Sequence, residues 1–242
     1  MKIFLAGASG STEQLLVAQL LHRGQQIVTV VRSIDSLPEG WLNQENISLI
    51  QASLLDLSDK KLAQLVKGCS AVASCLGHNI SLKGIYGQPR RLVTDAARRL
   101  CMAIKANQPK TPVRYVLMNT VGNRNRNLDE KLTWRDKFVT GIMRFALPPQ
   151  KDNEQAAEFL RTRIGQKDAE IEWVAVRPDS LFNEETVTEY TLHPSPTSSP
   201  IFGDGQTSRI NVAHFMADLI NNDTIWNKWK GQMPVIYNKR SS

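Results

Sequence analysis

Cysteine is scarce in this chain, and the few cysteines present form no recognisable site. Cys69, Cys75 and Cys101 are the only three among 242 residues. None belongs to a Cys-x-x-Cys pair or lies near a histidine cluster, which argues against a zinc site and against a disulfide scaffold. We therefore expect reduced, mostly buried thiols and no bound metal.

The sequence also lacks a long uninterrupted apolar run. Near the N-terminus the apolar residues are broken up by Gly7, Gly10 and polar side chains, so this segment has no continuous signal-peptide core. No later window is long enough to span a bilayer. We expect a cytoplasmic protein that does not insert into a membrane.

Biased tracts and internal repeats are missing as well, so global disorder is excluded. Apolar residues make up 41% of the chain and charged residues 22%. This composition is sufficient for one well-filled core, at a length near the limit for one domain. We expect residues 1–242 to form a single domain.

The net charge of +7 is dispersed along the chain instead of lying in one basic tract. One modest concentration is diluted by Asp129, Glu130 and Asp136, and no ladder of stacking aromatic residues accompanies it. Its basic members are Arg124, Arg126, Lys131, Arg135, Lys137 and Arg144. This distribution favours a solvated surface over a nucleic-acid interface, so no nucleic-acid partner is expected.

Strand-like and helix-like patterns alternate along the chain. The expected strands are 2–6, 26–31, 47–51, 71–76, 113–118, 171–176 and 233–237. The expected helices are 11–23, 58–67 (with Ser58 as its cap), 89–106, 152–165 and 212–220. Most strands are continuously apolar, which is typical of a parallel sheet covered on both faces. With right-handed crossovers, the pattern predicts a doubly wound α/β fold.

Two segments interrupt this alternation: 122–149 is long and basic, and 183–208 is rich in Ser, Thr, Pro and Gly. In a doubly wound sheet both would leave from the carboxyl ends of strands, where ligands bind. We expect these two segments to flank a small-molecule substrate.

The glycine turn that joins the first strand to the first helix is a candidate phosphate-binding loop. Gly7 allows a tight turn there, and Gly10 lets the backbone approach a pyrophosphate. The helix that follows offers unpaired N–H groups and the positive end of its dipole. Hydroxyl groups that can donate further hydrogen bonds come from Ser9, Ser11 and Thr12.

Glu13 stands where the pattern Gly-x-x-Gly-x-x-Gly has its third glycine. One interpretation is that Glu13 points to solvent and changes little. The other is that its carboxylate repels the phosphates and crowds the contact between strand and helix, which weakens the cofactor site. The second interpretation predicts that Glu13→Gly tightens NADPH binding about tenfold or more, the scale set by removing one repulsive contact.

Arg32 follows the second strand, at the position where NAD-specific sites carry an acidic residue. A guanidinium can pair with a 2′-phosphate in a bidentate manner and stack on adenine. An ordinary surface arginine is the alternative. The predicted cofactor is therefore NADP(H), bound more tightly than NAD(H).

With these residues in place, the chain resembles the atypical short-chain dehydrogenase/reductase family. It is most similar to the NmrA-like branch and to the biliverdin/flavin reductases. The resemblance implies a Rossmann sheet with a small C-terminal substrate lobe. Its motifs run in family order over almost the whole chain: Gly7-Ala8-Ser9-Gly10, Val30-Val31-Arg32, Cys75-Leu76-Gly77-His78-Asn79, Val116-Leu117-Met118-Asn119-Thr120, Glu172-Trp173-Val174-Ala175-Val176-Arg177-Pro178 and Arg209-Ile210-Asn211-Val212-Ala213.

The resemblance also implies where the cofactor lies. Ser53-Leu54 would lie beside adenine, although the family often has aspartate where Ser53 stands, and Leu76-Gly77-His78 would run along the ribose. Asn119-Thr120 would face the nicotinamide ribose. The segment from Pro178 to Leu181 would form a wall of the nicotinamide pocket.

The family's catalytic residues transfer poorly, because no tyrosine here has a lysine four residues later. Thr120 stands at the family's serine position and is a candidate to bond substrate or ribose. His78 is a candidate to polarise a carbonyl or contact a phosphate, with a structural role as the alternative. For Asp152-Asn153-Glu154 helix capping is the default interpretation, and Arg177 is expected to anchor the end of its strand.

Two functional hypotheses follow. The first is an NADPH-dependent reductase that transfers hydride directly to a small planar or carbonyl acceptor such as a flavin or quinone. Such transfer needs mainly a correctly stacked nicotinamide, with little acid–base help. The alternative is a non-catalytic NADP(H)-binding sensor or scaffold of the NmrA-like type, with a cofactor-dependent protein partner.

Overall fold

A computed structural model describes residues 1–35, 37–78, 87–128, 130, 148–199 and 202–239. The expected basic segment 122–149 lies mostly outside these residues, as does Asn79. Within the described chain, no helix has both the length and the apolar character needed to cross a membrane.

The first half of the chain alternates strictly between strand and helix or turn. Its regular elements are β1 (Lys2–Ala6), α1 (Ser11–His22), β2 (Gln26–Val31), the 3-10 turn η1 (Glu39–Trp41), β3 (Ile47–Gln51), the 3-10 turn η2 (Leu54–Asp56), α2 (Asp59–Val66) and β4 (Ala71–Ser74). The Ser58 hydroxyl accepts a hydrogen bond from the Lys61 amide, 3.2 Å away, so Ser58 caps α2 as predicted.

The second half continues the alternation and adds short strands near its end. Its elements are α4 (Leu92–Lys105), β5 (Val113–Met118), α6 (Pro148–Phe159), the π turn η3 (Leu160–Ile164), β6 (Ile171–Pro178), β7 (Ser180–Phe182), β8 (Tyr190–His193), β9 (Gln206–Ser208), α7 (Arg209–Asn221), α8 (Asp223–Trp229) and β10 (Val235–Asn238).

The eight-stranded sheet has the order β3-β2-β1-β4-β5-β6-β10-β8, and all its pairs are parallel except β10 with β8. The strand order reverses between β1 and β4. Ile3 of β1 is in register with Ile27 of β2 on one side and with Ala71 of β4 on the other. The predicted doubly wound, mainly parallel sheet is confirmed. Its topological switch point lies beside the loop after β1, where ligands bind in folds of this kind.

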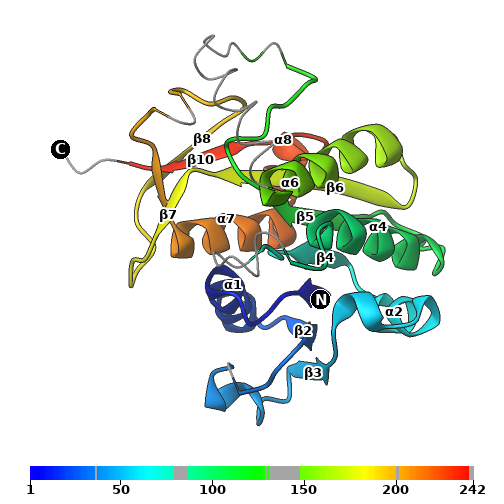
Figure 1. The fold of residues 1–242 in the computed structure, drawn as a ribbon. Coiled ribbons are helices and arrows are strands. Elements are labelled where there is room, and N and C mark those ends of the chain that lie inside the picture. The colour runs from blue at the N-terminus through cyan, green and yellow to red at the C-terminus, as the bar shows by residue number, and fades with distance from the viewer. Residues whose placement is uncertain (36, 79–86, 129, 131–147, 200–201, 240–242) are drawn as a thin grey trace.

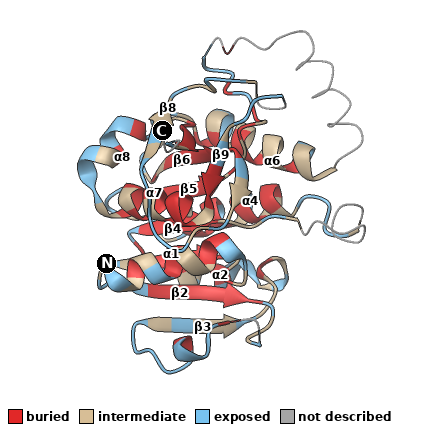
Figure 2. Cartoon of the chain, turned by 90° about the vertical axis from the view of Figure 1, so that its left-hand side faces the viewer, coloured by how far each residue is buried: buried red, intermediate tan, exposed pale blue. Residues whose placement is uncertain are grey.

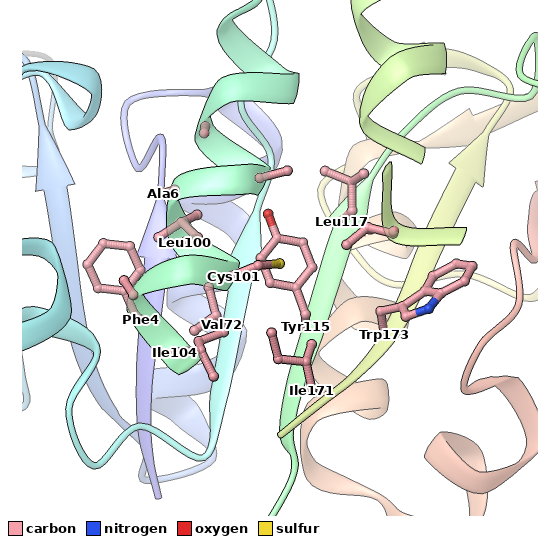
Figure 3. Close-up of a cluster of buried hydrophobic side chains, with 14 of the residues drawn as sticks. Phe4, Ala6, Val72, Leu100, Cys101, Ile104, Tyr115, Leu117, Ile171 and Trp173 are labelled. Carbon is pink, nitrogen blue, oxygen red and sulfur yellow. The ribbon is translucent and has the colours of Figure 1, made fainter. Parts of the chain in front are cut away.

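Helices cover the sheet on both faces (Figure 1). α2, α4 and α6 pack together on one face, and α1, α7 and α8 pack on the other. On the first face, Leu100, Cys101 and Ile104 of α4 lie against Phe4, Val72 and Tyr115 of the central strands (Figure 3). Figure 2 shows that the central strands are buried, whereas the edge strand β3 is only partly covered.

Several element boundaries differ from the prediction. α6 begins at Pro148, not at Asp152, because proline fits the first turn of a helix, where its missing N–H costs no hydrogen bond. β4 ends at Ser74, earlier than predicted, and β6 extends to Pro178. The short strands β7, β8 and β9 were not expected, since three or four residues carry too little periodicity. The seven-residue helix α8 was not expected either.

Candidate functional site

The loop from Gly7 to Gly10 closes on itself and leaves the start of α1 open. The Gly10 N–H donates to the Gly7 carbonyl at 2.8 Å, and Gly7 has φ +104°, a conformation that favours glycine. Gly10 occupies the N-cap position of α1, and no side chain caps this end. The first amides of α1 are therefore free of a cap, as a phosphate-binding helix terminus requires.

The loop hydroxyls lie in different environments. Ser11 is exposed and Ser9 half-buried, whereas Thr12 is only 5% exposed. A Cβ added to Gly10 would meet nothing closer than the Gly7 carbonyl at 3.5 Å, so the space over this glycine is open to a ligand. The loop thus fits a pyrophosphate in its backbone geometry and in the amides it leaves unpaired.

Glu13 is fully buried, so the interpretation that it points to solvent is wrong. Its side chain folds back under the loop: a Cβ on Gly7 would lie 2.5 Å from Glu13 Oε2 and 2.9 Å from Leu76 Cδ2. Neither carboxyl oxygen has a hydrogen-bond partner among the described residues. Burial raises the pKa of Glu13 well above its ordinary value.

Cys75, at the end of β4, lies near this carboxyl group. Burial raises the pKa of the Cys75 thiol, and the charge of Glu13 raises it further. The Cys75 sulfur also lies 3.8 Å from the sulfur of Met216 in α7. The carboxyl of Glu13 is therefore enclosed between the glycine loop and the end of β4.

Arg32 lies directly after β2, at the same edge of the sheet as the glycine loop. β1 and β2 are parallel, with Ala6 opposite Val30, so the ends of both strands are adjacent. Arg32 is exposed, and within the described chain no ion pair holds its guanidinium. Its side chain is therefore available to an anionic group beside the loop.

Ser53 and Leu54 follow β3 and form the start of η2. Leu54 is buried and Ser53 half-buried. Arg99 of α4 holds this turn, because its guanidinium donates to the carbonyl of Leu54 at 3.2 Å and also to the carbonyls of Leu55 and Leu57. The turn is thus fixed at the edge of the sheet where the adenine was expected.

His78 is bound to Asp152, a residue of α6. The two are joined by a contact of 2.9 Å between Nε2 and Oδ2, and the His78 side chain is only 5% exposed. Gly77 beside it is exposed. A catalytic role for His78 stays a prediction; its burial and its bond to a carboxylate favour the structural alternative.

Asp152 caps a helix, but not its own. Its carboxylate accepts the amides of Val93 and Thr94, at 2.8 and 3.0 Å, at the start of α4. Burial alone would raise the pKa of Asp152, but the hydrogen bonds from His78, Thr94 and Val93 outweigh it and hold the pKa below its ordinary value. Capping between two helices leaves no local pattern, so sequence reasoning did not assign it.

Asn119 and Thr120 follow β5 and differ in how far their side chains are engaged. The Asn119 amide group donates to the Asn153 carbonyl at 3.0 Å and accepts from the Thr120 amide at 2.8 Å and from Asn123. Among the described residues, the half-buried Thr120 hydroxyl accepts only a long bond, 3.4 Å, from the Gly122 amide. Thr120 therefore retains a hydroxyl proton for a ligand.

Arg177, at the end of β6, is a structural anchor, as predicted. It is fully buried, and its guanidinium pairs with Glu130 at 2.7 Å. It also donates to the carbonyls of Met233, Asn123 and Pro194. The pairing with Glu130 was not predicted, because the two residues lie far apart in the sequence without a shared motif.

Pro178 ends β6, and the next residue, Asp179, is bonded to β9 because its amide donates to the Thr207 hydroxyl at 3.2 Å. The Pro178 carbonyl accepts the Val121 amide at 3.0 Å, which ties this end to the loop after β5. Asp179 is buried, and burial raises its pKa, with a further contribution from Asp204. Gly205 lies so close to Asp179 and Tyr237 that a Cβ would come within 2.3 and 2.6 Å of them.

A cavity of about 340 Å³ opens next to this packing. Its walls come from β7 to β10 and the turns between them, and they include His193, Thr197, Asp204 and Tyr237. His193 and Tyr237 stack at a tilt, with ring centroids 5.9 Å apart. The cavity thus combines aromatic surface with hydroxyl and carboxyl groups.

Comparison with known proteins places this arrangement in a family. The profile of the NAD(P)H-binding family matches residues 7–223, which is most of the chain. The chain belongs to the NAD(P)H-binding family. This match begins at Gly7, the first residue of the phosphate loop, and confirms the predicted relationship to NAD(P)-binding dehydrogenase/reductase proteins. A comparison with curated protein sequences gave no match.

Solved structures show the same fold. A short-chain dehydrogenase/reductase from Veillonella parvula DSM 2008, in complex with NADP, is 18% identical with a TM-score of 0.71, over 98% of this chain and 94% of that one. An anaerobillin reductase from Escherichia coli O157:H7 is 17% identical, with a TM-score of 0.68 over 100% and 99%. The oxidoreductase ylbE from Lactococcus lactis is 16% identical, with a TM-score of 0.69 over 100% and 93%.

Proposed function

We propose that this protein is an NADPH-dependent oxidoreductase that reduces a small planar or carbonyl acceptor by direct hydride transfer. The observation that carries the proposal is the uncapped start of α1 behind Gly7–Gly10, with the exposed Arg32 at the end of the adjacent strand. The amides of α1 would bind the pyrophosphate, and Arg32 would pair with the 2′-phosphate.

The other cofactor contacts are proposed for residues at the carboxyl ends of the neighbouring parallel strands, the same side of the sheet on which the glycine loop lies. Ser53 and Leu54 would flank the adenine, and Leu76 and Gly77 would follow the ribose. Asn119 and Pro178 would flank the nicotinamide end. Asn119 already uses its amide group to hold the loop after β5 against helix α6, so it supports the site by fixing these segments.

The acceptor would bind beside Thr120 and Pro178, towards the cavity bounded by β7 to β10. The tilted pair of His193 and Tyr237 offers apolar faces to a planar molecule, and the hydroxyl groups of the walls offer orienting hydrogen bonds. The similar folds of an anaerobillin reductase and of a short-chain dehydrogenase/reductase in complex with NADP support a reductase of small molecules as the activity class.

When bound, the nicotinamide supplies the hydride, and the residues of this chain orient the reactants and exclude water. Thr120 would donate a hydrogen bond to the acceptor or to the ribose through its free hydroxyl proton. No Tyr-x-x-x-Lys pair exists in the sequence. The proposal therefore assigns rate mainly to alignment of the two reactants, which alone can supply large accelerations.

The test is NADPH oxidation by the purified protein with a panel of flavins, quinones and carbonyl compounds. The proposal expects turnover above about 1 per second with at least one class, an ordinary enzymatic rate. Tight cofactor binding with no turnover across the panel would contradict the reductase and favour the sensor or scaffold alternative, which would then be examined by cofactor-dependent pull-down.

A further inference from the structure

The buried carboxyl group of Glu13 is the feature that the proposed cofactor chemistry does not use. It lies under the loop expected to hold the pyrophosphate, with Oε2 on the side of Gly7 that a Cβ would occupy. Glu13 is 0% exposed, and neither oxygen has a hydrogen-bond partner within the described ranges. An unpartnered buried carboxyl group strongly favours its neutral, protonated form.

Within the part of the chain that the structure describes, the groups around Glu13 offer no compensating positive charge. Among the described residues, the titratable group that faces it is the Cys75 thiol from β4, and β1 contributes only backbone and apolar atoms at this end. Asp218 of α7 pairs at 2.8 Å with Arg23, at the carboxyl end of α1, and His214 of α7 lies 3.5 Å from Asp218. Arg23 stands ten positions after Glu13 along α1, a rise of roughly 15 Å.

A pyrophosphate at the start of α1 would bring negative charge close to this carboxyl group. An ionised Glu13 would then repel the cofactor in a region shielded from water, whereas a protonated Glu13 would not. This argument rests on the proposed cofactor site. We propose that Glu13 makes cofactor binding proton-linked: NADP(H) binds the protein in which Glu13 carries its proton.

Linkage fixes the sign of the effect. Cofactor binding stabilises the protonated form, so the pKa of Glu13 is higher in the complex than in the free protein. Below the free-protein pKa the dissociation constant is independent of this group. Above it, binding takes up a proton and the dissociation constant rises by up to about tenfold per pH unit.

The experiment is calorimetric titration of the full chain with NADP⁺, in pairs of buffers with different ionisation enthalpies, from about pH 6 to about pH 8.5. The wild type is expected to take up protons on binding over part of this range. Its dissociation constant should rise at least about fivefold more across the range than that of Glu13→Gln, whose neutral amide has nearly the same shape. The exposed Glu45 lies just before β3, at the amino ends of the strands, whereas the glycine loop lies at their carboxyl ends. Glu45→Gln is therefore the matched control, and it should behave as wild type.

Equal pH profiles and equal proton uptake for wild type and Glu13→Gln would overturn the inference while leaving the cofactor site intact. Absence of NADP⁺ binding by the wild type at every pH would overturn the inference and the proposed function together. If Glu13→Gln fails to fold, the proton uptake of the wild type decides: zero uptake at every pH contradicts the proposal.

Discussion

Arg32 and Glu13 lie on either side of the same loop, yet their surroundings are opposite. Arg32 is exposed directly after β2, whereas Glu13 is enclosed by Gly7, Cys75 and Leu76. The sequence predicts the positions of both residues, because strand, turn and helix are local features. It does not predict the burial of Glu13, because two of the residues that enclose it lie about sixty positions later at the end of β4.

Replacement of Arg32 by alanine tests the proposed 2′-phosphate contact. Arg32→Ala should weaken NADPH binding by about tenfold to a hundredfold, the usual effect of losing a charge-assisted bidentate contact. NADH binding should change by less than about threefold, since NADH has no phosphate there. Arg32→Lys, which keeps the charge but loses the planar fork, should fall in between. Equal losses for both cofactors in fluorescence titrations would remove Arg32 from this role.

Thr120 is the residue through which side-chain chemistry at the acceptor can be tested. Thr120→Val removes the hydroxyl group with little change in shape, and Thr120→Ser restores it. We expect Thr120→Val to lower kcat about tenfold or more with NADPH affinity nearly unchanged, and Thr120→Ser to stay within about threefold of wild type. Steady-state kinetics with the best acceptor from the panel provides the measurement; wild-type turnover by Thr120→Val would exclude this role.

At the scale of elements, the start of α4 depends on a residue of another helix. Arg91, at its N-cap position, makes no capping bond, and Asp152 of α6 accepts two of its first amides instead. The same carboxylate holds His78 after β4. Sequence patterns predict α4 and α6 separately, from their apolar spacing, but they carry no information on a cap that joins them.

Removal of the Asp152 carboxylate should destabilise the protein. Asp152→Ala removes the acceptor of two amides and the carboxylate that contacts His78 Nε2, so we expect a loss of about 2 kcal/mol or more in the free energy of unfolding. Asp152→Asn, which keeps one acceptor oxygen, should lose less. Urea unfolding followed by circular dichroism measures both values; a loss below about 0.5 kcal/mol for Asp152→Ala would contradict the capping role.

The lowered pKa of Asp152 adds a pH dependence to this prediction. The pKa of such a carboxyl group is lower in the folded state than in the unfolded state, where it is about 3.9. The group therefore stabilises the fold fully above the unfolded pKa, and this stability is lost as the pH falls through the folded pKa. The wild type should therefore lose stability below about pH 4 more steeply than Asp152→Asn. Parallel acid-unfolding curves would show that this carboxylate is not the group responsible.

At the scale of the whole molecule, the central sheet is the part that the sequence predicts best. Strands β1, β2, β3 and β5 have the predicted bounds. In β1, β2 and β5 the mostly apolar run reflects burial on both faces, whereas the edge strand β3 is only partly covered. In the C-terminal part, the helix and the strand at 212–220 and 233–237 are predicted and correspond to α7 and β10, whereas the region of β7 to β9 is predicted only as a loop-rich segment. β8 and β9 are too short to show alternation, and the wall of the cavity depends on contacts such as that of Gly205 with Asp179 and Tyr237.

The buried pair of Arg177 and Glu130 shows the same limit. Arg177 precedes Pro178 at a strand end, so an anchoring role follows from its position. Its partner Glu130 lies in a segment whose basic composition suggested a surface, yet only 7% of Glu130 is exposed. The sequence identifies the anchor, and the fold supplies the charge that an otherwise unpaired buried guanidinium requires.

The proposed function depends most on joint binding of NADP(H) by Gly7–Gly10 and Arg32. Titration of the wild-type protein with NADPH and with NADH, at one pH and one salt concentration, tests this binding most directly. The account predicts saturable binding of NADPH at least about tenfold tighter than that of NADH, a difference of about 1.4 kcal/mol. Equal affinities would contradict the role of Arg32, and absence of binding by either cofactor would contradict the site itself.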